Sequence, residues 1–528
     1  MKITITNLTR DNLSTDIALL APGASSSMSI SPDRGYLLAT SLQALESAGK
    51  IRLLVQDDST GSDKVEALTV GQYKSIGTST VYVSSTGSNS NPGTLSAPFL
   101  TIQGALNSLP KYLKHKTIVQ VGAGAFAGFM IQGFQFDYTD SLTIGDWLQV
   151  SGQLVTATLG QGTATGTATS GTAGTFFSST WGTLTDTTNN WSVDALRGLL
   201  LEITGGTGAT QIFPIHSNTA TAITIAGAWT APNGTSTYAI RDWATTINTT
   251  IPFPVSFATA SPSNRAGVVV VGNRGVLPGD GDIVLSNLKW TNVGRGVQHA
   301  GPSELLLRNC RLANTSGSGI SNLGGLVRTS RSSAIVGAGG TFYAPASTGN
   351  SIFTSFSNFV IDNGARAFDA HFGTMTVDHT SVKNCTQAAF NIGPLAGGHC
   401  AVDINSWGNN LDTCVKGFDF TPSGIFPTGS LSAIGGAVQS SNDTISNMTT
   451  AAIDITGPNF VSLTGTVGVG NAIGLRLTKG ASVQVAASTT LTGAIEVSID
   501  GATTDYATMR AASPKVINNS SYFTKFYE

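Results

Sequence analysis

An all-β fold, a right-handed parallel β-helix in which the chain coils as a solenoid, is predicted by three features of the sequence. The pattern apolar-x-apolar-x-Asn-apolar-x-apolar-x-Asn recurs between residues 283 and 499, and a Gly or Ala followed by an apolar residue comes shortly after it. The copies begin about every 21 to 27 residues, the length of one coil built from short strands of period two. The clearest copies start at Ile283, Leu305, Thr354 and Met375, with weaker ones at Val402, Val438, Val461 and Val483.

Two columns of asparagine mark the turns between the predicted strands. One contains Asn287, Asn309 and Asn358, and the other contains Asn292, Asn314, Asn363 and Asn384. Asparagine tolerates left-handed backbone angles, and its amide can hydrogen-bond to the same residue in the coil above or below. We therefore expect these residues to have a structural role.

The composition favours a folded, β-rich chain and excludes several classes of partner. Of the 528 residues, 40% are hydrophobic and 11% charged, and the apolar residues alternate regularly, which is not typical of a disordered segment. The net charge is −2 with no basic run, which argues against nucleic acid. No apolar run is long enough to insert into a membrane. Cys310, Cys385, Cys400 and Cys414 lack the spacing of metal ligands, so we predict no metal and no cofactor.

The regions before the repeats are predicted to be a small domain and a cap. Residues 1–70 combine strands at Lys2–Thr6, Asp16–Leu20 and Ile51–Gln56 with an amphipathic helix around Leu37–Leu45, an α+β pattern. Residues 78–145 should hold the cap and first coils of the solenoid. Because the open end of a β-stack has unpaired strands, it needs a cover. A helix over Thr101–Leu109 supplies one, and the first coil should follow at Thr117–Val121.

A second region interrupts the coils. Residues 146–243 have short strands and turn signals typical of a small inserted β-barrel or sandwich. Three tryptophans there (Trp181, Trp191, Trp229) are expected to fill its core rather than to stack on sugars. The β-helix should resume over residues 244–500, and residues 501–528 should form a C-terminal cap.

Two segments resemble parts of bacteriophage virion proteins. The stretch Val81–Leu106, with Ser-Asn-Pro-Gly-Thr-Leu-Ser-Ala-Pro-Phe at its centre, resembles the opening of pectin-lyase-like β-helices in phage tailspikes. Residues 1–70 resemble the N-terminal modules that anchor such proteins to the particle. The resemblance implies a virion protein that forms a homotrimer, contacts other virion proteins through residues 1–70 and binds host-surface polysaccharide. A capsid-decorating or head-fibre protein is an alternative.

One pair of carboxylates has the spacing of a glycosidase in the predicted register. If the coils at Met375 and Val402 are aligned, Asp378 and Asp403 both point outward, about 8 Å apart. Inverting glycosidases place their two carboxylates within roughly 6.5–9.5 Å of each other. The second alternative is therefore a polysaccharide depolymerase that uses this pair. We expect no catalysis, because the neighbouring side chains are polar and do not set the two acids apart.

The longest excursion between coils follows Val415. Three phenylalanines in it (Phe418, Phe420, Phe426) are expected to be exposed and to bind a sugar, a neighbouring subunit or the wall of the coils. Long loops on solenoids often carry binding sites, and a subunit contact is the favoured role.

Overall fold

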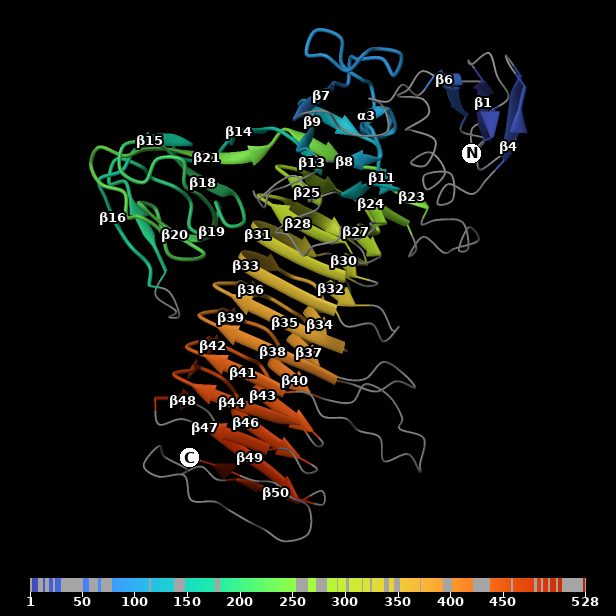
Figure 1. Cartoon of the computed structure of the whole chain (residues 1–528). Coiled ribbons are helices and arrows are strands. Elements are labelled where there is room, and N and C mark those ends of the chain that lie inside the picture. Colours follow the sequence, from blue (N-terminus) through green and yellow to red (C-terminus); the bar gives the residue numbers. More distant parts are fainter. Residues whose placement is uncertain are drawn as a thin grey trace.

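The computed structural model describes residues 78–113, 115–136, 148–175, 181–252 and most of 265–505 (Figure 1). It also describes short segments between residues 2 and 67 and the strand Phe526–Tyr527. The gaps within 265–505 are 272–282, 292, 301–302, 316, 323–324, 337–340, 346–351, 371, 393–400, 421–436, 457–458, 479–481, 486–487, 492–493 and 500–501. Apart from one helix, the regular secondary structure of the described chain is β-strand.

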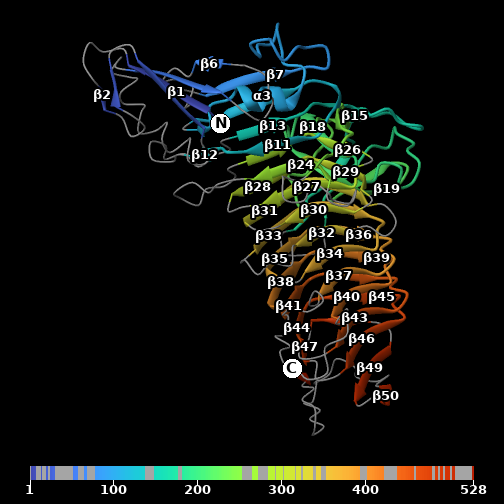
Figure 2. The same cartoon turned by 90° about the vertical axis from the view of Figure 1, so that its right-hand side faces the viewer.

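Most of these strands lie in coils that stack along one axis (Figures 1 and 2). Each coil contributes a first, a second and a third strand, and each strand pairs in parallel with its counterparts in the neighbouring coils. The first strands are β9 (Thr117–Val121), β13 (Leu148–Ser151), β25 (Ile283–Ser286), β28 (Glu304–Arg308), β31 (Gly325–Val336), β33 (Ile352–Asp362), β35 (Phe372–Asp378), β38 (Ala401–Trp407), β41 (Ala437–Ser441), β44 (Phe460–Thr464) and β47 (Ser482–Val485).

The second strands are short, and in β31 and β33 they continue from the first strand without a break. The separate ones are β10 (Gly124–Phe126), β22 (Thr245–Ile247), β26 (Lys289–Thr291), β29 (Arg311–Thr315), β36 (Ser381–Lys383), β39 (Asn410–Asp412), β42 (Thr444–Ser446), β45 (Val467–Val469) and β48 (Thr490–Leu491). The third strands are β11 (Phe129–Gln132), β24 (Arg265–Val271), β27 (Arg295–Ala300), β30 (Ser318–Asn322), β32 (Thr341–Pro345), β34 (Arg366–Ala370), β37 (Ala388–Ile392), β40 (Lys416–Phe420), β43 (Ala451–Thr456), β46 (Ile473–Thr478) and β49 (Ala494–Ile499).

The asparagine columns lie at the turns between these strands, in the left-handed region of backbone space. Asn287, Asn309 and Asn358 have φ between 51° and 55°, and Asn363 and Asn384 have φ of 63° and 61°. The Asn309 amide donates to Oδ1 of Asn287 across 3.3 Å, which links two successive coils. The predicted structural role is confirmed for these five residues, whereas Asn314 lies within β29 (Arg311–Thr315) and Asn292 lies outside the described residues. Arg331, His379 and Gly408 take the first position in other coils, and Thr413 and Gly470 take the second.

The interior of the stack is a single apolar core in which phenylalanine side chains pile up. The rings of Phe368, Phe390 and Phe418 stack with 4.8 Å between successive centroids, the ordinary spacing of paired strands. In two coils the residue before the inward apolar position is a glycine that lies close to the next coil. A Cβ on Gly296 would come within 2.3 Å of the Leu312 side chain, and one on Gly417 would come within 2.4 Å of the Ala452 carbonyl. This explains the small residue in the repeat.

One carboxylate is buried inside the coils. Asp443 accepts hydrogen bonds from the hydroxyls of Ser406 and Ser440, both at 2.7 Å, and from the backbone and side chain of Asn409. Burial raises the pKa of Asp443 to about 6, against the opposite effect of these hydrogen bonds. The folded protein therefore holds the proton more tightly than the unfolded chain does, and stability falls as the pH rises through about 6.

Replacing Asp443 by asparagine is expected to stabilise the protein at pH 8. One pKa unit corresponds to about 1.4 kcal/mol, so ionising this buried group lowers the free energy of unfolding by about 3 kcal/mol. The variant should keep most of that free energy at pH 8 and should match the wild type near pH 4. Thermal denaturation of both proteins from pH 4 to pH 8 measures the difference. A gap between them that does not change with pH would contradict the assignment.

The upper end of the stack carries a helix. The helix α3 (Ile102–Ser108) begins after Thr101, whose side chain accepts from the Gly104 amide, and buries Ile102, Ala105 and Leu106. It packs against β7 (Ser79–Val83), β9 and β11. The two-residue strands β8 (Tyr112–Leu113) and β12 (Gln135–Phe136) pair beside it.

A separate antiparallel sheet lies near that end, where Figure 2 labels β1 and β6. Its strand order is β4-β1-β5-β6. Its strands are β1 (Lys2–Asn7), β4 (Ser25–Ser29), β5 (Ile51–Gln56) and β6 (Val65–Ala67), and β2 (Leu13–Ser14) pairs with β3 (Leu19–Leu20). The predicted helix around Leu37–Leu45 lies outside the described residues. At the other end, β50 (Ala502–Asp505) pairs with β49, and β51 (Phe526–Tyr527) returns to β47.

The inserted region is an antiparallel sheet with a core of its own. Its strands are β14 (Leu154–Thr156), β15 (Thr165–Thr167), β16 (Ser170–Thr172), β17 (Thr183–Thr185), β18 (Leu200–Gly205), β19 (Ile212–Asn218), β20 (Ala222–Ile225) and β21 (Thr237–Trp243). Trp191 and Trp229 are buried in its core, which confirms their predicted role. The preceding strand β13 belongs to the coils, so the antiparallel part begins only at Leu154. The short strand β23 (Ile251–Pro252) follows and pairs with β24.

Candidate binding site on the outer face of the third strands

Polar residues recur on the outer face of the third strands, one residue after the inward apolar residue of each coil. In β34, β37, β40 and β43 they read Phe-Asp, Phe-Asn, Phe-Asp and Ile-Asp. The strand pairing aligns these residues in one line, which we call the outer column. It contains Gln298, Ser321, Asp369, Asn391, Asp419, Asp454 and Arg476.

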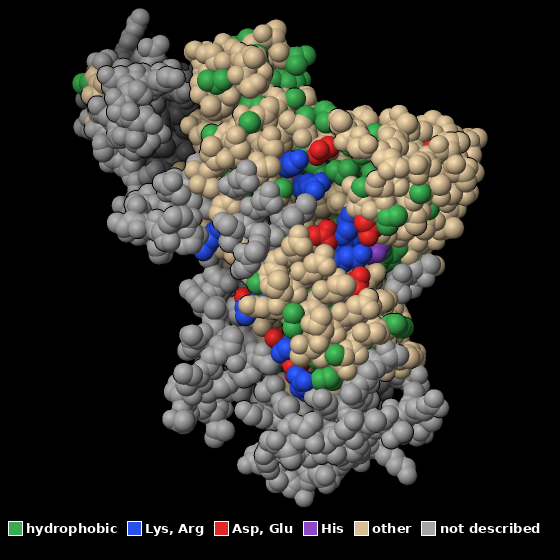
Figure 3. All heavy atoms as spheres, turned by 180° about the vertical axis from the view of Figure 1, so that it is seen from behind, with side chains coloured by type: hydrophobic (Ala, Val, Ile, Leu, Met, Phe, Trp, Pro, Cys, Tyr) green, Lys and Arg blue, Asp and Glu red, His purple; other side chains and the backbone are tan. Residues whose placement is uncertain are grey.

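Cations lie beside the acids of the outer column. Arg366 contacts Asp369 at 3.2 Å, and Asp369 also accepts from the side-chain amide of Asn391. Two coils further down, Lys416 contacts Asp419 at 3.0 Å and Asp454 at 2.8 Å. Arg476 then contacts Asp454 at 3.4 Å. Figure 3 shows pairs of basic and acidic side chains along one flank of the coils.

The charged groups on this face could bind a ligand by ion pairs and hydrogen bonds. Burial on its own would lower the pKa of Lys416, but the hydrogen bonds and charges of Asp454 and Asp419 raise it above the ordinary value. Lys416 therefore stays protonated and does not serve as a general base. Both carboxylates beside it are paired with cations, Asp419 with Lys416 and Asp454 with Lys416 and Arg476.

The predicted carboxylate pair is wrong in its spacing. The coils align Met375 with Ile404, so Asp403 lies opposite Thr374 and Asp378 lies opposite Trp407. The two carboxylates are thus four residues apart along the strand and one strand across, about 14 Å, which exceeds the range for a glycosidase pair. Asp403 is exposed, while Asp378 accepts from the Ser357 hydroxyl at 2.7 Å and contacts His379. Asp378 and Asp403 do not form a joint site.

The expected exposure of Phe418 and Phe420 is also wrong. Both side chains are buried in the core, and Phe418 stacks on Phe390. Both belong to the strand β40, and the residue between them, Asp419, is the one that faces outward. Phe426 lies outside the described residues. The aromatic residues therefore build the core, and the acid between them belongs to the outer column.

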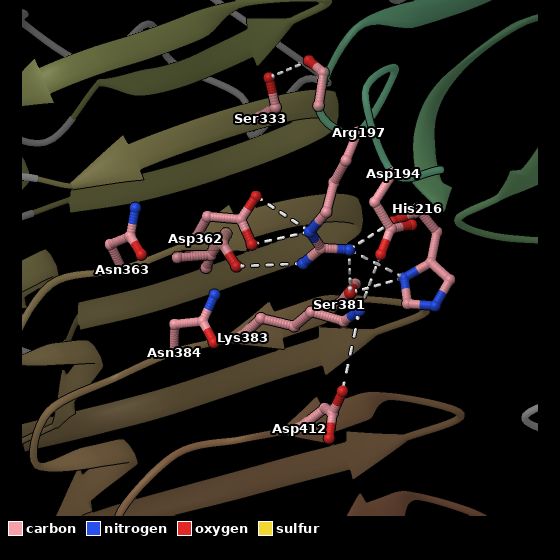
Figure 4. Close-up of polar contacts among 12 residues, drawn as sticks. Asp194, Arg197, His216, Ser333, Asp362, Asn363, Ser381, Lys383, Asn384 and Asp412 are labelled. Atoms are coloured by element: carbon pink, nitrogen blue, oxygen red, sulfur yellow. Dashed lines mark hydrogen bonds and ion pairs between the residues drawn. The ribbon is translucent and has the colours of Figure 1, made fainter. Parts of the chain in front are cut away.

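A second group of polar residues joins the inserted sheet to the coils (Figure 4). Arg197 donates from Nε to both carboxylate oxygens of Asp362, at 2.7 and 2.9 Å, and from Nη1 to the His216 carbonyl and the Ser381 hydroxyl. Nδ1 of His216 lies 2.6 Å from Oγ of Ser381. Lys383 lies between Asp194 and Asp412, at 3.8 and 3.7 Å.

These contacts hold the inserted sheet against the coils and do not form a catalytic site. Ser381 and His216 are both buried, so the pair lacks the access that a nucleophile needs. Burial, with the charges of Arg197 and Lys383, holds the pKa of His216 well below its ordinary value, so the ring is neutral. Trp181, buried at this junction, donates from Nε1 to the Gly408 carbonyl and packs edge-on against His216.

No metal site is found in the described part of the chain, where no group of three or more His, Cys, Asp or Glu side chains could hold an ion. Cys310, Cys385 and Cys414 are buried free thiols, and Cys400 lies outside the described residues. Among the same described residues, no helix is long and apolar enough to cross a membrane.

The fold and this face define an all-β protein of stacked parallel coils with a charged outer column. No family model matches the chain, and no curated protein matches it. Solved structures with some similarity include a lacto-N-biosidase from Eubacterium ramulus, with 10% identity over 78% of this chain and 64% of that one and a TM-score of 0.36. A rhamnogalacturonan lyase has 10% identity over 75% of each chain and a TM-score of 0.29. The tailspike protein of Pseudomonas phage LKA1 has 11% identity over 80% of this chain and 68% of that one and a TM-score of 0.21. Similarity this remote assigns neither a family nor a function.

Proposed function

We propose that this protein is a bacteriophage virion protein of the tailspike or fibre kind, a right-handed parallel β-helix that forms a homotrimer and attaches to polysaccharide on the host surface. Residues 1–70 are its anchor to other virion proteins, and residues 501–528 close the far end. The resemblance of Val81–Leu106 to the opening of tailspike β-helices and the stacked coils support this assignment.

The observation that carries the glycan-binding part of the proposal is the outer column. Carboxylate, amide and guanidinium groups follow one another there at the interstrand spacing, about 4.8 Å, and the Lys416 ammonium lies beside them. A polysaccharide repeats its hydroxyl and carboxyl groups along an extended chain and can contact several coils at once. Because Lys416 is a fixed cation between two acids, the arrangement supports binding without cleavage.

The test is binding of purified full-length protein to capsular and O-antigen polysaccharides, measured by biolayer interferometry together with an assay for reducing ends. We expect binding without release of reducing ends. Replacing both Arg366 and Arg476 by glutamine should weaken binding about tenfold, because each removes a charge-assisted hydrogen-bond donor. A control, Arg241→Gln, removes a similarly paired arginine from the inserted sheet and should leave binding unchanged. Gold-labelled antibodies against the protein should decorate intact particles.

Three results would contradict the proposal in different ways. Particles without label would remove the virion assignment. Wild-type affinity in the double variant would remove the outer column as the binding face. Release of reducing ends would make the protein a depolymerase, with acids other than the separated Asp378 and Asp403.

A further inference from the structure

The line of outer-column residues and the line of cations beside it extend from β34 through β32 and β30 to β27, where other residue types occupy them. Pairing in register aligns Arg366 with Thr341 and Ser318, and Ser318 with Arg295 in β27. The same register places Gln298, three residues after Arg295, in the column that holds Asp369. Arg295 and Gln298 in β27 are therefore equivalent to Arg366 and Asp369 in β34. The corresponding pair in β40 is a lysine followed three residues later by an aspartate.

The upper pair differs from the lower pairs in that its charge has no counterpart. Arg366 and Lys416 each contact the acid three residues further on. In β27 the acid is replaced by glutamine, and Arg295 has neither an ion pair nor a hydrogen bond to any residue of the described chain. Its side chain is half-buried, and burial alone lowers its pKa. The cation is thus partly removed from water without an anion beside it.

Gln298 supplies a second, independent sign of a missing partner. Only 4% of its surface is exposed, and its Oε1 is buried with no hydrogen-bond donor in the described part of the chain. A buried amide oxygen without a donor is costly, so it is usually satisfied by a ligand or an ordered water. Ser321, the next residue of the outer column, is also buried and adds a hydroxyl to the same face.

We propose that Arg295 and Gln298 form a subsite for a sugar residue that carries a carboxylate, such as a hexuronic acid in an acidic polysaccharide. The ligand carboxylate pairs with Arg295, as the Asp369 carboxylate pairs with Arg366, and a neighbouring ring hydroxyl donates to Oε1 of Gln298. A simple carboxylate offers only acceptors and would leave that oxygen unsatisfied, whereas a uronic acid carries a donor next to its carboxylate. This inference rests on the proposed attachment to glycans and names their chemical class.

The experiment is titration of the full-length protein with a galacturonate hexasaccharide by isothermal calorimetry at low salt. Arg295→Gln should weaken binding at least about tenfold, because it removes a charge-assisted hydrogen bond. Gln298→Glu should weaken it as strongly while leaving the melting temperature unchanged or higher, because the new carboxylate pairs with Arg295 as Asp369 does with Arg366. Arg241→Gln is the control of equal charge change, and the same hexasaccharide with reduced carboxyl groups should not bind.

The outcomes separate this inference from the function on which it rests. Undiminished binding of the hexasaccharide by Arg295→Gln, or equal binding of the carboxyl-reduced form, would overturn the acidic subsite. Binding of neutral surface polysaccharides alone would also overturn it and would leave glycan attachment intact. Displacement of the hexasaccharide by acetate at the same concentration of carboxylate would also overturn the inference, because it would show a site for any simple anion. Failure to bind any polysaccharide would overturn both proposals.

Discussion

Replacing Leu307 by aspartate is expected to abolish the soluble, folded protein. The Leu307 side chain is fully buried, in register with Leu285 above and Thr329 below, and belongs to the single core of the coils. The substitution removes about 1.5–3 kcal/mol of apolar burial and places a charge in an apolar core. Few domains have enough stability to absorb a buried, unpaired carboxylate. Expression yield and circular dichroism of the variant measure the effect.

The matched control is Leu306→Asp, the same change one residue earlier. Leu306 points to the opposite face of β28 and is only partly buried. This variant should fold with a loss of at most about 1 kcal/mol, as surface substitutions usually do. Equal yields of the two variants would show that β28 does not have the described orientation.

The second large effect is expected at the junction between the inserted sheet and the coils. Replacing Arg197 by methionine leaves the Asp362 carboxylate partly buried without its cation and removes the donor to the His216 carbonyl. Breaking one side of a buried ion pair typically lowers stability by about 3–5 kcal/mol. The inserted sheet keeps its own core, so it should detach while remaining folded. Amide hydrogen exchange should accelerate in β19 and β36, which face each other there.

Acidification should loosen the same junction. The pKa of His216 in the folded protein lies well below its ordinary value of about 6.5. At a pH between these two values the unfolded chain binds more protons than the folded protein, so stability is lost as the pH falls below about 6.5.

Arg241→Met is the control for Arg197→Met, because the Arg241–Glu202 pair is more exposed and should contribute about 1 kcal/mol or less. Unchanged exchange in Arg197→Met would mean that other contacts alone hold the sheet in place.

Local signals in the sequence predicted the repeating part of the fold well. The helix at Ile102–Ser108 and the strand Thr117–Val121 lie where the apolar pattern and the turn residues place them. The repeat also aligned the first strands correctly except for the copy at Val402. There the aligned residue is Ile404, because Gly408 takes the left-handed turn position that asparagine marks elsewhere. A slip of two residues keeps every side chain on its own face, so the alternation of the strand could not reveal it.

In the predicted register the slip places Asp403 too close to Asp378. The outer column is a separate signal, because it lies one residue after the Gly/Ala-apolar pair of the repeat, at Asp369, Asn391, Asp419 and Asp454. The junction around Arg197 had no such signal, because it joins residues more than 160 positions apart and follows no period.

The inserted sheet also changes how the shaft should respond to force. In a plain stack of coils, each coil contacts only its two neighbours, so the stack can unfold coil by coil from one end. Here the inserted sheet touches one turn after another: Trp243 donates to the Asn309 carbonyl, Arg331 lies over the Phe213 ring, and Trp181 reaches Gly408. It therefore cross-links the upper coils, which should unfold together under force. The coils beyond Gly408 should unfold one at a time.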